Sequence, residues 1–134
     1  MNDRKISKNF THGEVACKCG GCRGAAKISP DLIVRLQAMR DEYGPIRVNS
    51  GVRCRKHPES KARPTSSHVP ADHGDSEGRV GHAVDIWTPN SGRRFRLLAA
   101  AIAAGFTRIG LGKTFLHLDN ARKKAQNVAW DYYK

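Results

Sequence analysis

The spacing of hydrophobic residues predicts an amphipathic helix that begins after Ser29. Ser29 is a favourable N-cap, Pro30 suits the first helical position, and the pair Gly44-Pro45 ends the helix. The hydrophobic residues recur at intervals of four, three and four, which places them on one helical face: Leu32, Leu36, Met39 and Tyr43. We expect this face to pack into the core.

A second helix is predicted to begin at Ser91, which is a candidate N-cap, and to end at Gly105. Three large hydrophobic residues within it again follow helical spacing, namely Phe95, Leu98 and Ile102. We expect these three side chains to form the buried side of the helix.

Shorter hydrophobic segments predict the strands of a sheet. In residues 46–48, apolar and polar side chains alternate, and residues 83–87 have the apolar character of a buried strand. Two later strands are expected at 107–111 and 115–119. The aromatic tail at 128–133 is expected to pack back on the sheet. Helices that flank a mostly antiparallel sheet indicate an α+β fold.

The length of 134 residues favours one domain over residues 1–134. Residues 1–27 are interrupted by glycines and are expected to form a loop-rich arm, and residues 55–80 are polar and irregular. The longest apolar run, residues 97–104, is far shorter than the roughly 20 residues of a membrane span. No apolar stretch follows the first residues, so we expect no signal peptide.

The chain is strongly basic, with 24 Lys and Arg against 12 Asp and Glu and a net charge of +12. Such a surface attracts polyanions, which include nucleic acids, anionic lipids and bacterial wall polymers. Specific nucleic-acid binding is disfavoured because the four Phe, three Tyr and two Trp are not interleaved with basic residues.

Four cysteines leave three interpretations open. Cys17, Cys19 and Cys22 are crowded together, whereas Cys54 lies far along the chain. Cys54 could form a disulfide with one of the three, the four could be buried thiols, or the four could hold a structural zinc ion. We rank the disulfide first and the zinc site last.

Two predicted strands carry polar side chains that suggest a metal site. Asp85 lies in an apolar strand, where a carboxylate is costly unless it is paired or bound to a metal. On the strand 115–119, side-chain alternation places Phe115, His117 and Asp119 on one face. Polar ligands that project from two strands are typical of a metal site with an open position.

These segments resemble, in order, the zinc D-alanyl-D-alanine peptidases and their relatives. That group includes carboxypeptidases, dipeptidases and peptidoglycan endopeptidases, and it shares its metal-binding fold with the hedgehog signalling domain. The resemblance covers nearly the whole chain. It is carried by Trp130 and by four motifs, at residues 50–54, 66–68, 81–86 and 115–119.

The resemblance implies one catalytic Zn²⁺ held by His68, Asp85 and His117, with water in the fourth position. It further implies that Arg53 grips a carboxylate or carbonyl oxygen of the substrate, and that Ser66 contacts the substrate backbone.

The chain departs from the family pattern between its first two expected ligands. Sixteen residues separate His68 from Asp85, where the family has about six, so residues 69–80 contain an insertion. His73 is an alternative ligand, but we prefer His68 because residues 66–68 keep the Ser-x-His motif of the family. His82 is disfavoured because it points to the opposite strand face from Asp85.

A second departure concerns the general base. Many relatives carry an acid three residues before the last histidine, where this chain has Thr114. Asp119 could serve as the base or could orient a metal ligand, and metal-activated water could act without a protein base. The insertion, which could form a lid over the zinc or a solvated loop, offers three more acids: Asp72, Asp75 and Glu77.

The sequence therefore predicts a monomeric zinc metallopeptidase that cleaves peptidoglycan stem peptides or crosslinks, as a carboxypeptidase or an endopeptidase. Its basic surface would bind anionic wall polymers. We expect synthesis in the cytoplasm and action on the cell wall, as in a phage lysis or virion protein or an exported bacterial enzyme. The alternative function is a non-catalytic, metal-binding recognition module of the same fold.

Overall fold

The computed structural model describes residues 4–19, 22, 27–54, 57–63, 66–70 and 80–132. The helices are α1 (His12–Val15), α2 (Pro30–Tyr43), α3 (Pro58–Ala62) and α4 (Ser91–Ala103). The strands are β1 (Lys27–Ile28), β2 (Val48–Ser50), β3 (Val80–Gly81), β4 (Ala83–Trp87), β5 (Arg108–Leu111), β6 (Phe115–Asp119) and β7 (Val128–Asp131).

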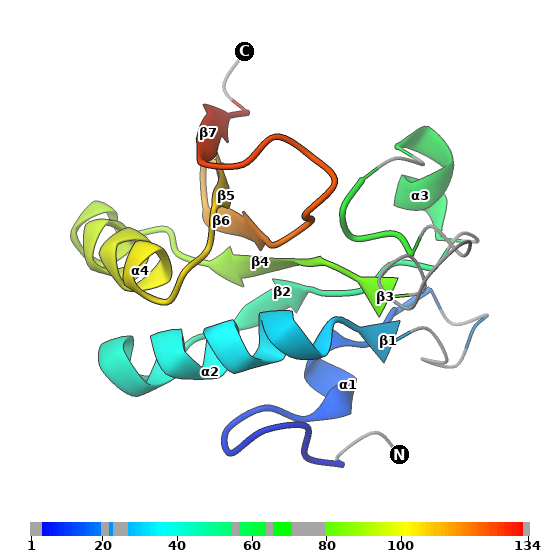
Figure 1. Cartoon of the computed structure of the whole chain (residues 1–134), viewed down its shortest axis with the longest axis horizontal. Helices are drawn as coiled ribbons and strands as arrows, with labels where there is room; N and C mark the ends of the chain where they lie inside the picture. Colours follow the sequence, from blue (N-terminus) through cyan, green and yellow to red (C-terminus); the bar gives the residue numbers. More distant parts are fainter. Residues whose placement is uncertain are drawn as a thin grey trace.

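The described strands form a sheet of order β2-β4-β6-β5-β7 and a small parallel pair of β1 with β3 (Figure 1). Within the larger sheet, every neighbouring pair is antiparallel except β5 and β7. The predicted α+β class with a mostly antiparallel sheet is confirmed.

Helix α2 begins and ends where its sequence predicts. The Ser29 hydroxyl accepts a hydrogen bond from the backbone N–H of Leu32 at 3.3 Å, and Gly44 follows the last turn with a φ of +106°. A positive φ suits glycine because it has no Cβ to clash. Four side chains of the helix are buried, namely Leu32, Ile33, Leu36 and Met39.

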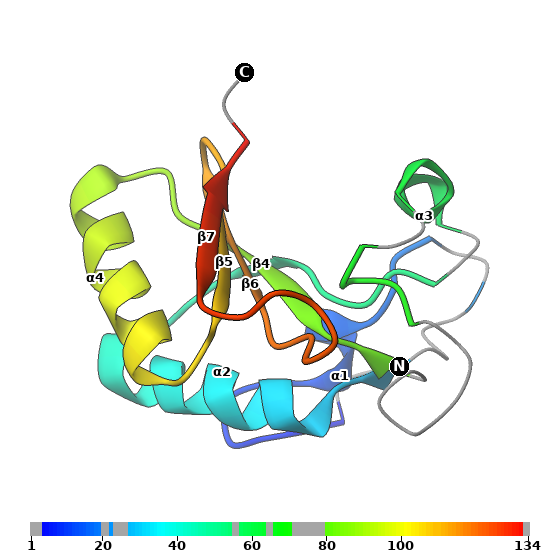
Figure 2. The ribbon, with the colours of Figure 1, turned by 45° about the horizontal axis from the view of Figure 1, so that its top comes forward.

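The register of β4 against β6 separates a hydrophobic face of the sheet from a polar one. Val84 pairs with Leu118, and both belong to the core cluster that includes side chains of α2 and α4. Asp85 pairs with His117, and these side chains point to the opposite face because strand residues alternate. Figure 2 shows α2 and α4 on one side of the sheet and α3 on the other.

Helix α4 exposes part of the face that its spacing predicted to be buried. Phe95 is 73% exposed and Ile102 is 59% exposed, whereas Leu97 and Ala101 are buried. The side chains that pack most tightly, Leu97 and Ala101, lie outside the regularly spaced set, so periodicity alone did not identify the face that packs against α2. The N-cap is Asn90, one residue before the predicted Ser91, and its side chain accepts a hydrogen bond from the N–H of Arg93.

The remaining differences concern short elements formed by contacts between distant segments. The aromatic tail contributes a strand of its own, β7, which pairs with β5. The expected loop-rich arm contains α1 and ends at β1. Strand β2 begins at Val48, so the predicted strand at 46–48 is displaced along the chain.

Replacement of the α2 cap tests this account of the helix. Ser29→Ala removes the bond to Leu32 and an acceptor for Asn120 Nδ2, so we expect it to lower the free energy of unfolding by about 1 kcal/mol. Val34→Ala, at an exposed position of α2, is the control and should change it by less than about 0.5 kcal/mol. Urea denaturation measures both. Equal effects would contradict the capping role.

Candidate metal centre and active site

Three side chains from separate segments meet at the polar face of the sheet. His68 comes from the segment after α3, Asp85 from β4 and His117 from β6. Each offers one ligand atom, and these atoms lie within 4.8 Å of one another. One carboxylate oxygen of Asp85 lies 3.3 Å from His68 Nε2 and 3.1 Å from His117 Nδ1. The structure thus brings together the three side chains that the resemblance suggested as ligands.

The backbone fixes the orientation of His68. Its Nδ1 donates to the carbonyl oxygen of Gly51 at 2.6 Å, because a carbonyl can only accept. Its backbone carbonyl accepts from the N–H of Arg53 at 2.9 Å, and its backbone N–H donates to Ser66 Oγ at 3.3 Å. The other ring nitrogen, Nε2, is therefore directed at Asp85.

Asp119 holds His117 from the side away from Asp85. His117 Nε2 lies 2.8 Å from Asp119 Oδ2. The second carboxylate oxygen accepts from Arg108 Nε at 2.7 Å and from the N–H of Ala121 at 3.1 Å. Asp119 is only 1% exposed, so both of its oxygens are committed to protein partners in a buried setting.

Burial and hydrogen bonding oppose each other in the pKa values of the centre. Burial raises the pKa of Asp85, but the close contacts of its carboxylate with the rings of His117 and His68 outweigh burial, and the net pKa is lowered. Asp119 has a lowered pKa by the same balance, through its bond with His117. Burial lowers the pKa of His68. Burial would also lower the pKa of His117, but the hydrogen bonds of this ring to Asp119 and Asp85 outweigh burial and raise the pKa of His117. Both carboxylates are thus kept ionised.

The donor set fits a zinc ion. Two imidazole nitrogens and a carboxylate oxygen are common zinc ligands, and catalytic sites use three protein ligands and leave one position open. A metal-ligating histidine also tends to donate its second ring N–H to a carbonyl or carboxylate. Gly51 and Asp119 accept in this way from His68 and His117.

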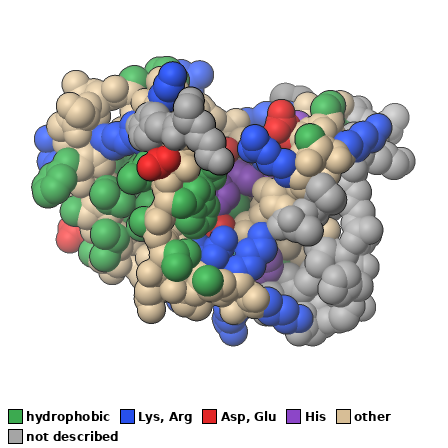
Figure 3. Space-filling model, turned by 90° about the horizontal axis from the view of Figure 1, so that it is seen from above, with side chains coloured by type: hydrophobic (Ala, Val, Ile, Leu, Met, Phe, Trp, Pro, Cys, Tyr) green, Lys and Arg blue, Asp and Glu red, His purple; other side chains and the backbone are tan. Residues whose placement is uncertain are grey.

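A pocket of about 770 Å³ opens over the three side chains. Both residues expected to contact the substrate line it, Arg53 and Ser66. Arg53 Nη2 lies 3.3 Å from the second oxygen of Asp85, so its guanidinium reaches the centre itself. Figure 3 shows histidine side chains at the bottom of a hollow that lysine and arginine side chains surround.

Several pocket residues were missed by the sequence analysis. Three of them are basic, namely Arg63, Arg108 and Lys124, and Tyr132 adds an aromatic side chain. Lys124 and Tyr132 follow no recognisable pattern. Arg108 could have been found, because a strand at 107–111 beside 115–119 places a cation within reach of the buried Asp119.

Other candidate residues do not join the centre. Thr114 is exposed and does not line the pocket, so nothing at this position replaces the acid that relatives carry. His82 bonds to Asn120 at 3.3 Å instead of Asp85, as its strand face predicted. The acids and the histidine proposed from the insertion lie outside the described residues: Asp72, His73, Asp75 and Glu77.

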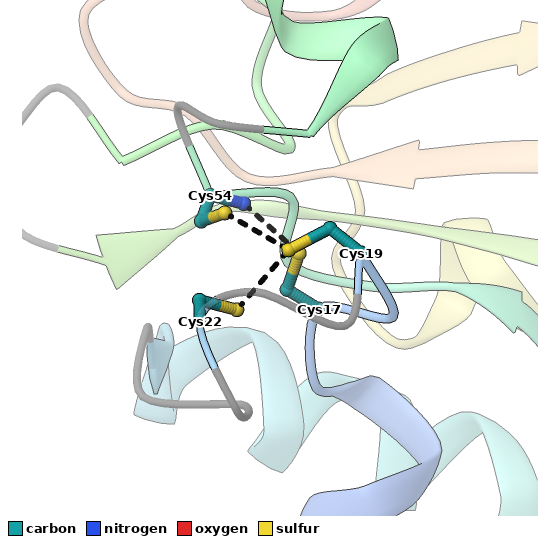
Figure 4. Close-up of side chains that lie close together, drawn as sticks. All are labelled: Cys17, Cys19, Cys22 and Cys54. Carbon is teal, nitrogen blue, oxygen red and sulfur yellow. Dashed lines mark hydrogen bonds between the residues drawn. The ribbon is translucent and has the colours of Figure 1, made fainter.

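The four cysteines, all within the described residues, form a second cluster (Figure 4). Their sulfur atoms lie within 4.8 Å of one another. The structure holds all four as thiols, so it contains no disulfide of the kind that the sequence analysis ranked first.

Comparison with known proteins agrees with this geometry. A family model described as Peptidase M15 matches residues 8–119, well over half of the chain. The match includes Arg53 and the three side chains that meet at the centre, and it confirms the resemblance drawn from the sequence motifs. No curated protein and no solved structure matches the chain.

The close approach of Gly51 to the arm provides a test of how His68 is held. A Cβ on Gly51 would lie 2.3 Å from the carbonyl oxygen of Val15, so the backbone must shift. We expect Gly51→Ala to lower the free energy of unfolding by about 1–3 kcal/mol and to alter the NMR signal of the His68 ring N–H.

The control is Gly92→Ala, because its Cβ would meet only Asn90 Oδ1, at 3.4 Å. This variant should leave the His68 signal unchanged and keep or slightly raise the stability. A Gly51→Ala protein with unchanged stability and an unchanged His68 signal would contradict the packing argument.

Proposed function

This chain belongs to the peptidase M15 family, and from that premise we propose that it is a zinc-dependent peptidase that cleaves the peptide part of peptidoglycan. Family membership supports the metallopeptidase type of activity. The observation that carries the finer proposal is the buried cluster of His68, Asp85 and His117 at the bottom of a basic pocket.

In this proposal the zinc ion is held by His68 through Nε2, by the Asp85 carboxylate and by His117 through Nδ1. Bound zinc polarises a substrate carbonyl and lowers the pKa of a coordinated water. The protein contributes the orientation of both rings, because the opposite nitrogen of each ring is engaged by Gly51 or Asp119.

Arg53 and Ser66 are proposed to position the substrate. Peptidoglycan stem peptides carry carboxylates, and a guanidinium can bind a carboxylate with two parallel hydrogen bonds. Arg53 is partly buried beside Asp85, so a substrate group bound there would lie close to the metal. The other basic side chains of the pocket favour an acidic peptide by their charge.

Of the two roles expected for Asp119, the contacts favour orientation of His117. A general base needs a free carboxylate oxygen within reach of the attacking water. Both oxygens of Asp119 already accept hydrogen bonds, from His117, Arg108 and Ala121. We therefore assign Asp119 as a positioning residue for His117. The water bound to zinc would then lose its proton to solvent, without a protein base, or to an acid of the insertion.

The exposed position of Thr114 favours one alternative, a recognition module that binds metal and peptide without cleaving it. Such a module would use the same pocket and the same three ligands. The two functions differ only in turnover, so an assay of product release separates them.

We propose that the protein acts on the cell wall as a monomer. Its net charge of +12 suits binding to anionic wall polymers. Among the helices of the described residues, none combines the length and the apolar character needed to cross a membrane.

The proposed function predicts that Asp85→Ala loses activity and one zinc ion per chain. The wild-type protein should release peptide fragments from purified peptidoglycan, and mass spectrometry of the products identifies the bond that is cut. Circular dichroism should show that the variant still folds. Glu42→Ala, at an exposed acid on α2, is the control and should match the wild type. A variant that keeps both zinc content and activity would refute the assignment.

A wild-type protein that binds zinc and stem peptide but releases no product would support the recognition module. A protein that binds neither would exclude both functions.

The positioning role predicts that Asp119→Asn weakens zinc binding by about 10–100-fold and that saturating zinc restores turnover. If Asp119 were the general base, the rate should instead fall by a factor on the order of 10²–10⁴ with zinc fully bound. Zinc titration followed by activity measurement at saturation distinguishes the two outcomes.

A further inference from the structure

The cysteine cluster has the sulfur spacing of a tetrahedral metal site. Cys19 Sγ lies 3.6 Å from Cys22 Sγ and 3.5 Å from Cys54 Sγ, and all four sulfurs lie within 4.8 Å of one another (Figure 4). A disulfide requires a sulfur–sulfur distance of about 2.0 Å. Tetrahedral zinc–sulfur bonds of about 2.3 Å place the sulfurs roughly 3.8 Å apart.

We propose that Cys17, Cys19, Cys22 and Cys54 bind a structural zinc ion, separate from the ion of the peptidase centre. Four thiolates complete the tetrahedral coordination of zinc and leave no open position, which is the arrangement of structural sites. Thiolate ligands also favour zinc over magnesium or calcium, which prefer oxygen.

The surroundings of the cluster suit a negatively charged metal–thiolate centre. A zinc ion with four thiolates carries a net charge of −2. The backbone N–H of Cys54 points at Cys17 Sγ at 3.3 Å and can stabilise this charge.

The ion would join two segments that are distant in the sequence. Three ligands lie in the arm that follows α1, and the fourth lies just beyond β2. The same segments already meet where the N–H of Val52 donates to the carbonyl of Val15 at 2.8 Å. The zinc would therefore fix the backbone of Arg53, which lies between this contact and Cys54.

Zinc content and coordination test the proposal, and neither measurement depends on peptidase activity. The chain expressed in a reducing cytoplasm should contain two zinc ions by native mass spectrometry. Asp85→Ala should contain one, and X-ray absorption at the zinc edge of this variant should show sulfur ligands alone, at about 2.3 Å.

The reciprocal variant is Cys19→Ser, which should keep the zinc of the peptidase centre and bind the second zinc more weakly, with three thiolates instead of four. With cobalt in place of zinc, thiolate-to-cobalt charge-transfer absorption should be present in Asp85→Ala and weaker in Cys19→Ser. If Cys19→Ser does not fold, the absorption measurements on the wild type and on Asp85→Ala still decide the question.

Four results would overturn the proposal. One is an Asp85→Ala protein without zinc, and another is zinc coordinated by nitrogen and oxygen alone. The third is iron in place of zinc, which the colour of the protein and metal analysis would reveal. Mapping of a disulfide that includes Cys54 in the freshly purified wild type would also count against it. Loss of peptidase activity with two zinc ions bound would leave this site intact and refute only the proposed function.

Discussion

The Asp85 carboxylate imposes the main constraint on this structure. It is an ionised group in the central strand pair, with hydrophobic neighbours in its own strand on the core side. A buried charge is tolerated only when partners surround it, and removal of one partner from such a pair costs several kcal/mol. The chain supplies partners from three directions, since His117 comes from the adjacent strand and His68 and Arg53 come from loops. The pocket lies where these segments converge.

Local signals explain which parts of the fold the sequence predicts well. Helix α2 is bounded by a serine cap and a glycine, and one apolar stripe matches its buried face, so short-range rules suffice. Strands β4 and β6 could be predicted because each is a short apolar segment, and alternation within β6 places His117 and Asp119 on one face. Helix α4 also has an apolar periodicity, but the side chains it selects are not the ones that pack, since Phe95 and Ile102 are exposed and Leu97 and Ala101 are buried. Its packing face is determined by α2, which no local pattern reveals.

In the candidate site, too, local patterns identify some residues, whereas others are placed by contacts between distant segments. His117 and Asp119 could be identified from strand alternation, but His68 lies in a loop and was found only through the family resemblance. The cysteine cluster could not be predicted in full for a related reason. Spacing shows that Cys17, Cys19 and Cys22 are close, but the position of Cys54 depends on how the arm packs against the end of β2. Lys124 and Tyr132 enter the pocket through tertiary contacts alone.

The bond between His68 and the carbonyl of Gly51 has a consequence for transplanting this centre into another scaffold. The acceptor is a main-chain atom, so its placement is encoded by the path of the chain, including the close approach of Gly51 to Val15. Grafting His68, Asp85 and His117 as side chains onto a new sheet would leave the tautomer of His68 undefined. A designer would have to copy the backbone turn that follows β2 together with the three ligands.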